Sequence, residues 1–443
     1  MSLKRGIFYT FLTQAPTLVL FFISSTLMSR ILGDEGRGAY ALLTNQVALF
    51  SVLLWFNLTA GITYFTSKAK RARSTIVGTA TTVLLADLIL IALVLFGIHQ
   101  VNVLQDVFMP EMASHWSYYL YVYLSIALGL IQSAISAVLL GLKQFKVLNI
   151  MSILGASVSA AAFLVLFLWV GDRSSADMVP YVLGLSLGIL LLLMIVWCIY
   201  YALIVGIVPR PTFSLRELRP VFLFSSVGYL SILINMINYR FDIWVVDHFN
   251  GTAALGLYSV AVGLGQLLFN IPEPFSRVIQ PFLYGQKQDD MISRFKLVAR
   301  MNFTFVACAA IGLGAVAGML VPLLFGEVFA GSVPALRLLL PGILFSSATK
   351  MLATLVIQKG FQRFNLYATM AGALVTIVLD LLLIPHWGIM GAAVASSASY
   401  FVILVLVLLT IRSKIGMSIR DLFILKPADI RLLRTAPPWR TMR

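Results

Sequence analysis

The chain has 443 residues, of which 60% are hydrophobic and only 11% are charged, with a net charge of +15. Soluble domains average about 45 to 50% apolar and 25% charged residues, so this composition excludes a soluble globular protein and indicates a membrane protein with many spans. The basic residues lie in short loops, so the positive charge favours contact with anionic lipid and argues against nucleic-acid binding.

Apolar runs of about 20 residues, the length that a helix needs to cross a bilayer, occur about twelve times. We therefore predict an all-α polytopic membrane protein. The predicted spans, in chain order, are residues 7–32, 41–65, 75–98, 116–140, 147–170, 180–205, 220–249, 258–282, 297–325, 335–357, 365–384 and 389–411.

The basic residues also predict the orientation of the spans, because Lys and Arg of short loops are retained on the cytoplasmic side. They precede the first span, follow every even-numbered span and recur in the tail. The intervening loops are poor in Lys and Arg and carry acidic residues such as Asp34, Glu35 and Glu327. Both termini are therefore predicted to be cytoplasmic.

Two short motifs occur twice. LGDEGRGAYALL follows the first span and NGTAALGLYSVA follows the seventh, with Gly38 and Gly256 separated by 218 positions. GLKQF at 141–145 matches GFQRF at 360–364 with an offset of 219. We predict a duplicated unit and read the first motif as an outer hairpin whose glycines permit a tight reversal. The predicted parts are an N-terminal six-helix lobe (1–209), a cytoplasmic linker (210–219), a C-terminal six-helix lobe (220–412) and a basic cytoplasmic tail (413–443).

Polar residues recur on single faces of several predicted spans. The seventh span has Ser231, Asn235, Asn238 and Asp242 at steps of 4, 3 and 4, which share one helical face. The eighth span continues this pattern with Gln266, Asn270, Glu273 and Arg277. The first span has a milder version: the positions 218 residues before those of the seventh-span stripe include Thr13, Thr17 and Ser24. Such residues either bond between packed helices or line a polar cavity. The charged members favour the cavity, because a charge at the membrane centre costs about 2.5 to 3.5 kcal/mol.

Basic residues dominate this predicted cavity, which suits an anionic substrate such as a diphosphate. We predict that substrate contacts come from Arg30, Arg240, Arg277 and Lys350. The carboxylates are either counter-ions or sites for a coupling H⁺ or Na⁺, and the sequence leaves both roles open; they are Asp87, Asp242 and Glu273. No cofactor, metal site or nucleotide-binding loop is predicted. The pattern indicates a secondary transporter that works by alternating access, and not an enzyme.

Several motifs together resemble a known family. These are the LG-x-x-G-x-G-x-Y pattern after the first span, YRFDIWVVDHFNGTAALGLYSVA at 239–261 and PHWGIMGAAVASSASY at 385–400. They resemble the polysaccharide exporters, including Wzx-type O-antigen flippases, of the multidrug/oligosaccharidyl-lipid/polysaccharide (MOP) superfamily. The resemblance implies two MATE-like lobes around a cationic cavity in the bacterial inner membrane. Asp242 matches an acidic position of the family.

The resemblance also implies the substrate. It is undecaprenyl-diphosphate-linked oligosaccharide, an O-antigen, capsule or exopolysaccharide repeat unit, which moves from the cytoplasmic to the periplasmic leaflet. Membrane lipids, a glycan polymerase and chain-length proteins are the other implied partners. Alternatives are a MATE-like multidrug or organic-cation antiporter, a lipid II flippase and a membrane glycan polymerase. The basic residues argue against the antiporter, and the short predicted outer loops argue against the polymerase.

Overall fold

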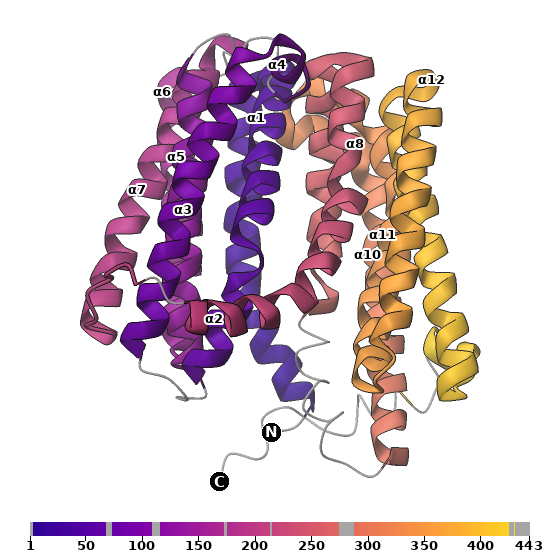
Figure 1. The fold of residues 1–443 in the computed structure, drawn as a ribbon. Coiled ribbons are helices and arrows are strands. Elements are labelled where there is room, and N and C mark those ends of the chain that lie inside the picture. Colours follow the sequence, from indigo (N-terminus) through magenta and orange to yellow (C-terminus); the bar gives the residue numbers. More distant parts are fainter. Residues whose placement is uncertain are drawn as a thin grey trace. The chain divides into compact units, whose positions relative to one another are not determined.

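A computed structural model describes residues 3–67, 73–108, 116–171, 175–212, 215–273, 288–424 and 429. Within these ranges the chain is helical apart from turns and short connections, and no strand occurs (Figure 1). This confirms the predicted all-α class. The helices are α1 (Leu3–Trp55), α2 (Leu58–Ser67), α3 (Arg73–Gln100), α4 (Asn102–Phe108), α5 (Trp116–Gly141), α6 (Phe145–Val170), α7 (Val179–Ile204), α8 (Leu215–Phe269), α10 (Gln288–Phe325), α11 (Ser332–Gln358) and α12 (Gln362–Thr410).

Nine helical segments in the described ranges are long and apolar enough to cross a membrane. Three of them pass through a glycine with non-helical backbone: Gly33 in α1 (φ 67°, ψ −172°), Gly251 in α8 (φ 81°, ψ 168°) and Gly388 in α12 (φ 56°, ψ −138°). Positive φ with extended ψ is open almost only to glycine, because any other L residue would bring its Cβ into a clash. Each of these glycines therefore ends one helix and begins another. Nine segments with three divisions give twelve spans, as predicted.

The conformations of these glycines repeat along the chain. Gly33 and Gly251 have nearly the same backbone angles and differ by 218 positions (251 − 33). Gly171 (φ 72°, ψ −158°) ends α6 and lies 217 positions before Gly388 (388 − 171), which has a similar conformation. The duplicated sequence therefore specifies the same helical hairpins at matching positions.

The turns that are predicted to be cytoplasmic repeat as well, but the backbone aligns them with a different offset from that of the matching sequence letters. After α5, Lys143 N donates to Leu140 O and has φ 62°. After α11, Gly360 N donates to Ile357 O and has φ 84°. Both are left-handed residues that close a helix end with equivalent bonds, and they differ by 217 positions (360 − 143). The predicted offset of 219 at this turn is wrong, because the backbone aligns Lys143, and not Gly141, with Gly360.

The chain forms two compact units, residues 19–256 and residues 1–18 with 257–443. In the first unit, α5 packs against α2, α3, α6 and α7. Half of the residues in the most apolar segment of α5 are buried, whereas the share is 17 to 22% in α3, α6 and α7. In the second, α11 packs against α10 and α12 and is also 50% buried. The central helices of the units are therefore α5 and α11. The lobe boundaries drawn from the sequence stay a prediction.

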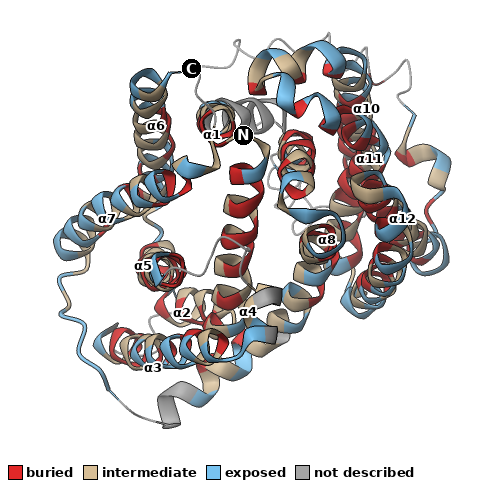
Figure 2. Ribbon diagram, turned by 90° about the horizontal axis from the view of Figure 1, so that it is seen from above, coloured by how far each residue is buried: buried red, intermediate tan, exposed pale blue. Residues whose placement is uncertain are grey.

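Large apolar side chains cover the outer surfaces of both units. Leu203 is 78% exposed, Trp169 75% and Ile311 74%. Exposed residues follow α6 and α7 along much of their length (Figure 2). Apolar surface of this extent is typical of helices that face lipid.

The two repeated glycine motifs, residues 32–43 and 250–261, touch each other within the 19–256 unit. A Cβ on Gly38 would overlap the backbone carbonyl of Thr252, and a Cβ on Gly256 would overlap the carbonyl of Asp34. The two contacts are reciprocal, since Thr252 follows Asp34 by 218 positions and Gly256 follows Gly38 by the same number. The glycines of the motif therefore allow two backbones to approach, in addition to permitting the reversal at Gly33.

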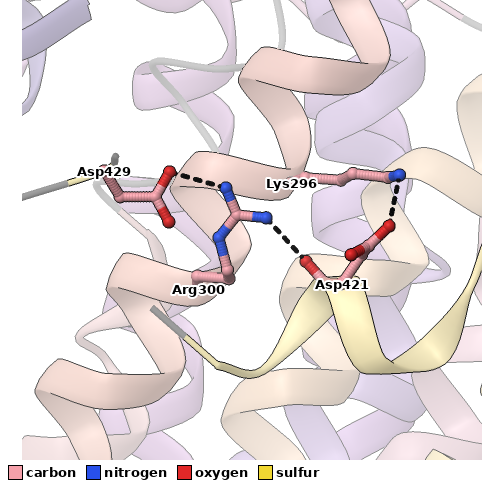
Figure 3. A network of polar contacts seen from close by, with 4 residues as sticks. All are labelled: Lys296, Arg300, Asp421 and Asp429. Atoms are coloured by element: carbon pink, nitrogen blue, oxygen red, sulfur yellow. Dashed lines mark hydrogen bonds and ion pairs between the residues drawn. The ribbon is translucent and has the colours of Figure 1, made fainter. Parts of the chain in front are cut away.

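Charged residues hold the segment after α12 against the start of α10 (Figure 3). Lys296 Nζ lies 2.9 Å from Asp421 Oδ2. Arg300 donates through Nη2 to Asp429 Oδ1 at 2.7 Å and through Nη1 to the backbone oxygen of Asp421 at 2.9 Å. The beginning of the predicted tail thus folds back on α10. The start of α10 and the end of α12 lie on one face, as an even number of spans between them requires.

Candidate functional site

The eighth predicted span, residues 258–282, contains a break near its middle. Helix α8 ends at Phe269, and a turn at Asn270 and Ile271 follows. Pro272, which comes next, has no N–H to donate to the preceding turn. Interrupted membrane helices expose unpaired backbone groups at their ends, and secondary transporters commonly bind substrates or ions at such breaks.

Lys350 of α11 reaches this break. Its Nζ donates to the backbone oxygen of Phe269 at 3.2 Å and lies 3.1 Å from the centroid of the Phe269 ring. Glu273, just beyond the break, is within electrostatic range of the ammonium. A cation at a helix C-terminus is stabilised by the partial negative charge of the terminal carbonyls. The structure therefore brings a basic side chain, a carboxylate and a helix end together inside a membrane-spanning region.

The seventh-span stripe lies along α8 and is used in two ways. Asn235 Nδ2 donates to Ser231 O at 2.8 Å, so this amide bonds within its own helix. Asn238 and Asp242 are buried, with 1% and 6% of their surface exposed. Two members of the stripe are thus enclosed by neighbouring helices, while Ser231 and Asn235 are half-buried.

The other predicted residues differ in burial. Arg277 and the side chain of Thr13 lie outside the described residues. Ser24 and Asp87 are buried; Thr17, Arg30, Arg240, Asn270 and Lys350 are half-buried; Gln266 and Glu273 are exposed.

The predicted residues belong to both compact units. Arg30, Asp87 and the seventh-span stripe are in the 19–256 unit, whereas Thr17, the eighth-span residues and Lys350 are in the other. A single cavity that collects all of them stays a prediction.

The sequence did not single out Arg37, which is 9% exposed and lines a cavity of about 560 Å³ within the 19–256 unit. Its guanidinium donates to Ser25 Oγ at 3.3 Å and lies 3.7 Å from the Met28 sulfur. One signal could have identified it. Arg37 lies in a predicted outer loop, where the distribution of Lys and Arg disfavours a basic residue.

A model of the family described as "Polysaccharide biosynthesis protein" matches residues 3–284, well over half of the chain. The teichuronic acid biosynthesis protein TuaB of Bacillus subtilis (strain 168) is 27% identical over 138 residues. That match covers 30% of this chain and 28% of TuaB, so less than a third of the relative's length is aligned.

Solved structures share the fold at low identity. The lipid II flippase MurJ, in an inward-closed conformation, matches with a TM-score of 0.72 and 12% identity over 93% of this chain and 88% of MurJ. An inward-facing multidrug resistance MATE family transporter of the MOP superfamily matches with a TM-score of 0.68 and 14% identity, over 90% of this chain and 94% of the transporter. Fold and family matches agree with the predicted MOP-type architecture. The chain is a multi-pass membrane protein that belongs to the polysaccharide biosynthesis protein family.

Proposed function

We propose that the protein is a flippase that moves undecaprenyl-diphosphate-linked oligosaccharide from the cytoplasmic to the periplasmic leaflet of a bacterial inner membrane. The observation that carries this proposal is the position of Lys350 at the break in α8. A basic group inside the membrane suits a phosphate, whereas an exporter of organic cations would need a predominantly acidic site there. The family match and the MOP-type fold support a transporter of lipid-linked glycans.

In the proposed mechanism, the diphosphate and glycan enter a polar path while the polyprenyl chain stays in lipid. Lys350 donates a hydrogen bond to a phosphate oxygen. Glu273 acts as the counter-ion of Lys350 or as a site for a coupling cation. The membrane potential, negative inside, favours outward movement of two negative charges by about 4.6 kcal/mol at 100 mV, from about 2.3 kcal/mol per charge. The potential therefore drives transport in the direction of export without nucleotide hydrolysis.

The test is a flipping assay in proteoliposomes with a synthetic undecaprenyl-diphosphate-linked saccharide under an imposed potential. We expect Lys350→Gln to slow flipping about tenfold or more, because a charge-assisted hydrogen bond contributes about 1.5 to 3 kcal/mol and 1.4 kcal/mol is a factor of ten. Lys359→Gln, which removes the same charge at the end of the same helix, should flip at the wild-type rate. Thermal unfolding checks that both variants fold.

Two results would contradict the proposal. Wild-type flipping by Lys350→Gln would remove this residue from the substrate path. Failure of the wild-type protein to move the lipid-linked saccharide, together with export of organic cations from the same vesicles, would favour the MATE-like antiporter.

A further inference from the structure

The cavity beside Arg37 lies wholly within the 19–256 unit, whereas Lys350 and the break in α8 belong to the other compact unit. Its volume of about 560 Å³ is within the range of about 300 to 1,000 Å³ that is typical of small-molecule sites. Its wall is formed by residues of α1, α5, α6 and α7, and the lining residues used below come from α1, α6 and α7. The cavity can therefore enclose part of a lipid headgroup but not a long glycan.

The lining favours an anion over a cation. Arg37 is basic, and none of the described residues that line the cavity is an Asp or a Glu. Hydroxyl groups supplement the guanidinium: Ser25 accepts from Arg37 at 3.3 Å, and the Oγ of Ser186 is buried with no hydrogen-bond partner among the described residues. A guanidinium with neighbouring hydroxyls is a suitable donor set for a phosphate.

The polarity of the cavity changes along the membrane normal. Ser175 N donates to Ile31 O, so the α6–α7 connection lies at the same end as the Gly33 hairpin, which is the predicted outer end. Arg37, one turn beyond Gly33, and Ser186, two turns into α7, therefore lie toward the outer end of the cavity.

The inner end of the cavity is mainly apolar. One face of α6 lines it from Leu148 to Phe163, a rise of about 22 Å at 1.5 Å per residue. Leu148 is near the start of α6, Trp197 is in the last two turns of α7, and Leu193 is just past the middle of α7, so the wall from Leu193 onward lies toward the predicted cytoplasmic side. The cavity thus combines a cationic, hydroxyl-rich outer end with an apolar inner end.

We infer that this cavity binds the phosphate headgroup of a lipid in the outer leaflet, with Arg37 on the phosphate and the hydrocarbon chain directed inward along α6 and α7, toward Leu193. A lipid of the outer leaflet has this orientation, because its headgroup is outward and its chain points toward the bilayer centre. The chemistry fits both a polyprenyl diphosphate and a bilayer phospholipid. Polyprenyl diphosphate is chosen as one probe because of the proposed function. The lipid site itself is inferred from the lining of the cavity and requires binding only, not translocation.

The test measures binding to the full-length, delipidated protein by native mass spectrometry and by titration in detergent. The probes are undecaprenyl diphosphate, phosphatidylglycerol and inorganic pyrophosphate. We expect at least one of the two lipids to bind, and Arg37→Gln to weaken that binding about tenfold. Arg210→Gln, which removes an exposed charge from the linker of the same unit, should bind as the wild type does.

A second variant tests the cavity without removing its charge. A Cβ at Gly155 would make ordinary contact with Leu193 Cδ1 at 3.4 Å, so Gly155→Leu fits the backbone and fills the lining. It should weaken lipid binding and leave thermal unfolding close to that of the wild type. Stronger binding of undecaprenyl diphosphate than of phosphatidylglycerol would identify the transported lipid as the ligand, and the reverse would identify a bilayer lipid.

Three results would overturn the inference: wild-type lipid affinity in both Arg37→Gln and Gly155→Leu, binding of pyrophosphate alone, or no binding of either lipid. These outcomes are distinct from failure of the proposed function. If Arg37→Gln abolishes lipid binding but flips substrate normally, the result supports the lipid site and shows that transport does not depend on it.

Discussion

Arg300 is a buried arginine whose surroundings define its energetic role. It is 6% exposed and bonds to Asp429 and to the backbone of Asp421 (Figure 3). The neighbouring ion pair of Lys296 and Asp421 is more exposed, with side-chain exposures of 24% and 28%. Water screens an exposed ion pair, whereas removal of one partner from a buried pair leaves the other charge without compensation. The buried pair should therefore fix the tail more strongly than the exposed pair.

We predict that Arg300→Met destabilises the protein by about 3 to 5 kcal/mol, because it removes the buried ion pair with Asp429 and the hydrogen bond to the backbone of Asp421. Lys296→Met should cost no more than about 1 kcal/mol. Thermal unfolding in detergent measures both, and limited proteolysis reports whether the segment after α12 is released. The double variant Arg300→Met/Asp429→Leu should recover part of the loss, and no recovery would show that Arg300 acts through other contacts.

At the scale of the helical element, glycines determine where one membrane helix ends and the next begins. Gly33 has angles that are essentially reserved for glycine, so Gly33→Ala should cost about 1 to 3 kcal/mol. Gly251→Ala should behave alike, because its backbone conformation is nearly the same. Gly97 in α3 is helical and has open space where a Cβ would lie, with no atom within 4 Å, so Gly97→Ala should be neutral or stabilising by about 1 kcal/mol. Thermal unfolding of the three variants checks this difference, and equal effects would contradict it.

The sequence predicts the helical elements well where a single physical property decides them. Hydrophobic length locates all twelve spans, and Pro272 explains the interruption of the eighth. The second predicted span is different: residues 41–65 are divided between α1 and α2 by Phe56 and Asn57, which have φ of 45° and 55°. Asn57 Nδ2 donates to Ser225 O, a residue 168 positions away, so this break depends on tertiary contacts that local sequence does not show.

The candidate sites are harder to predict than the spans for the same reason. Lys350 and Glu273 stand out because charges are rare in apolar helices. Arg37 does not, because its motif has the composition of an exposed loop, and its burial arises only when α5, α6 and α7 complete the cavity. Helical periodicity assigns a residue to a face, but the partner that covers that face comes from distant sequence.

At the scale of the whole molecule, the proposed function makes a prediction for cells. Loss of the protein should cause a lipid-linked oligosaccharide to accumulate on the cytoplasmic leaflet, because synthesis continues while export stops. Mass spectrometry of extracted polyprenyl diphosphates would identify the accumulated species and its sugars. Complementation with the wild-type gene should remove it, and Lys350→Gln should not. No accumulation, with normal surface glycan, would show that the protein has another substrate.

The reciprocal contact of the two glycine motifs also bears on the origin of the fold. Gly38 meets Thr252 and Gly256 meets Asp34, which is the pattern of an isologous interface, where residue i of one subunit meets residue j of the other and the reverse. A symmetric homodimer of a six-helix ancestor would have this contact twice across its axis. Gene fusion would then preserve both copies in one chain, and each copy would be free to change on its own. The basic residue at position 37 has no basic counterpart 218 positions later, where Leu255 stands, so the two copies have already diverged beside the contact that they share.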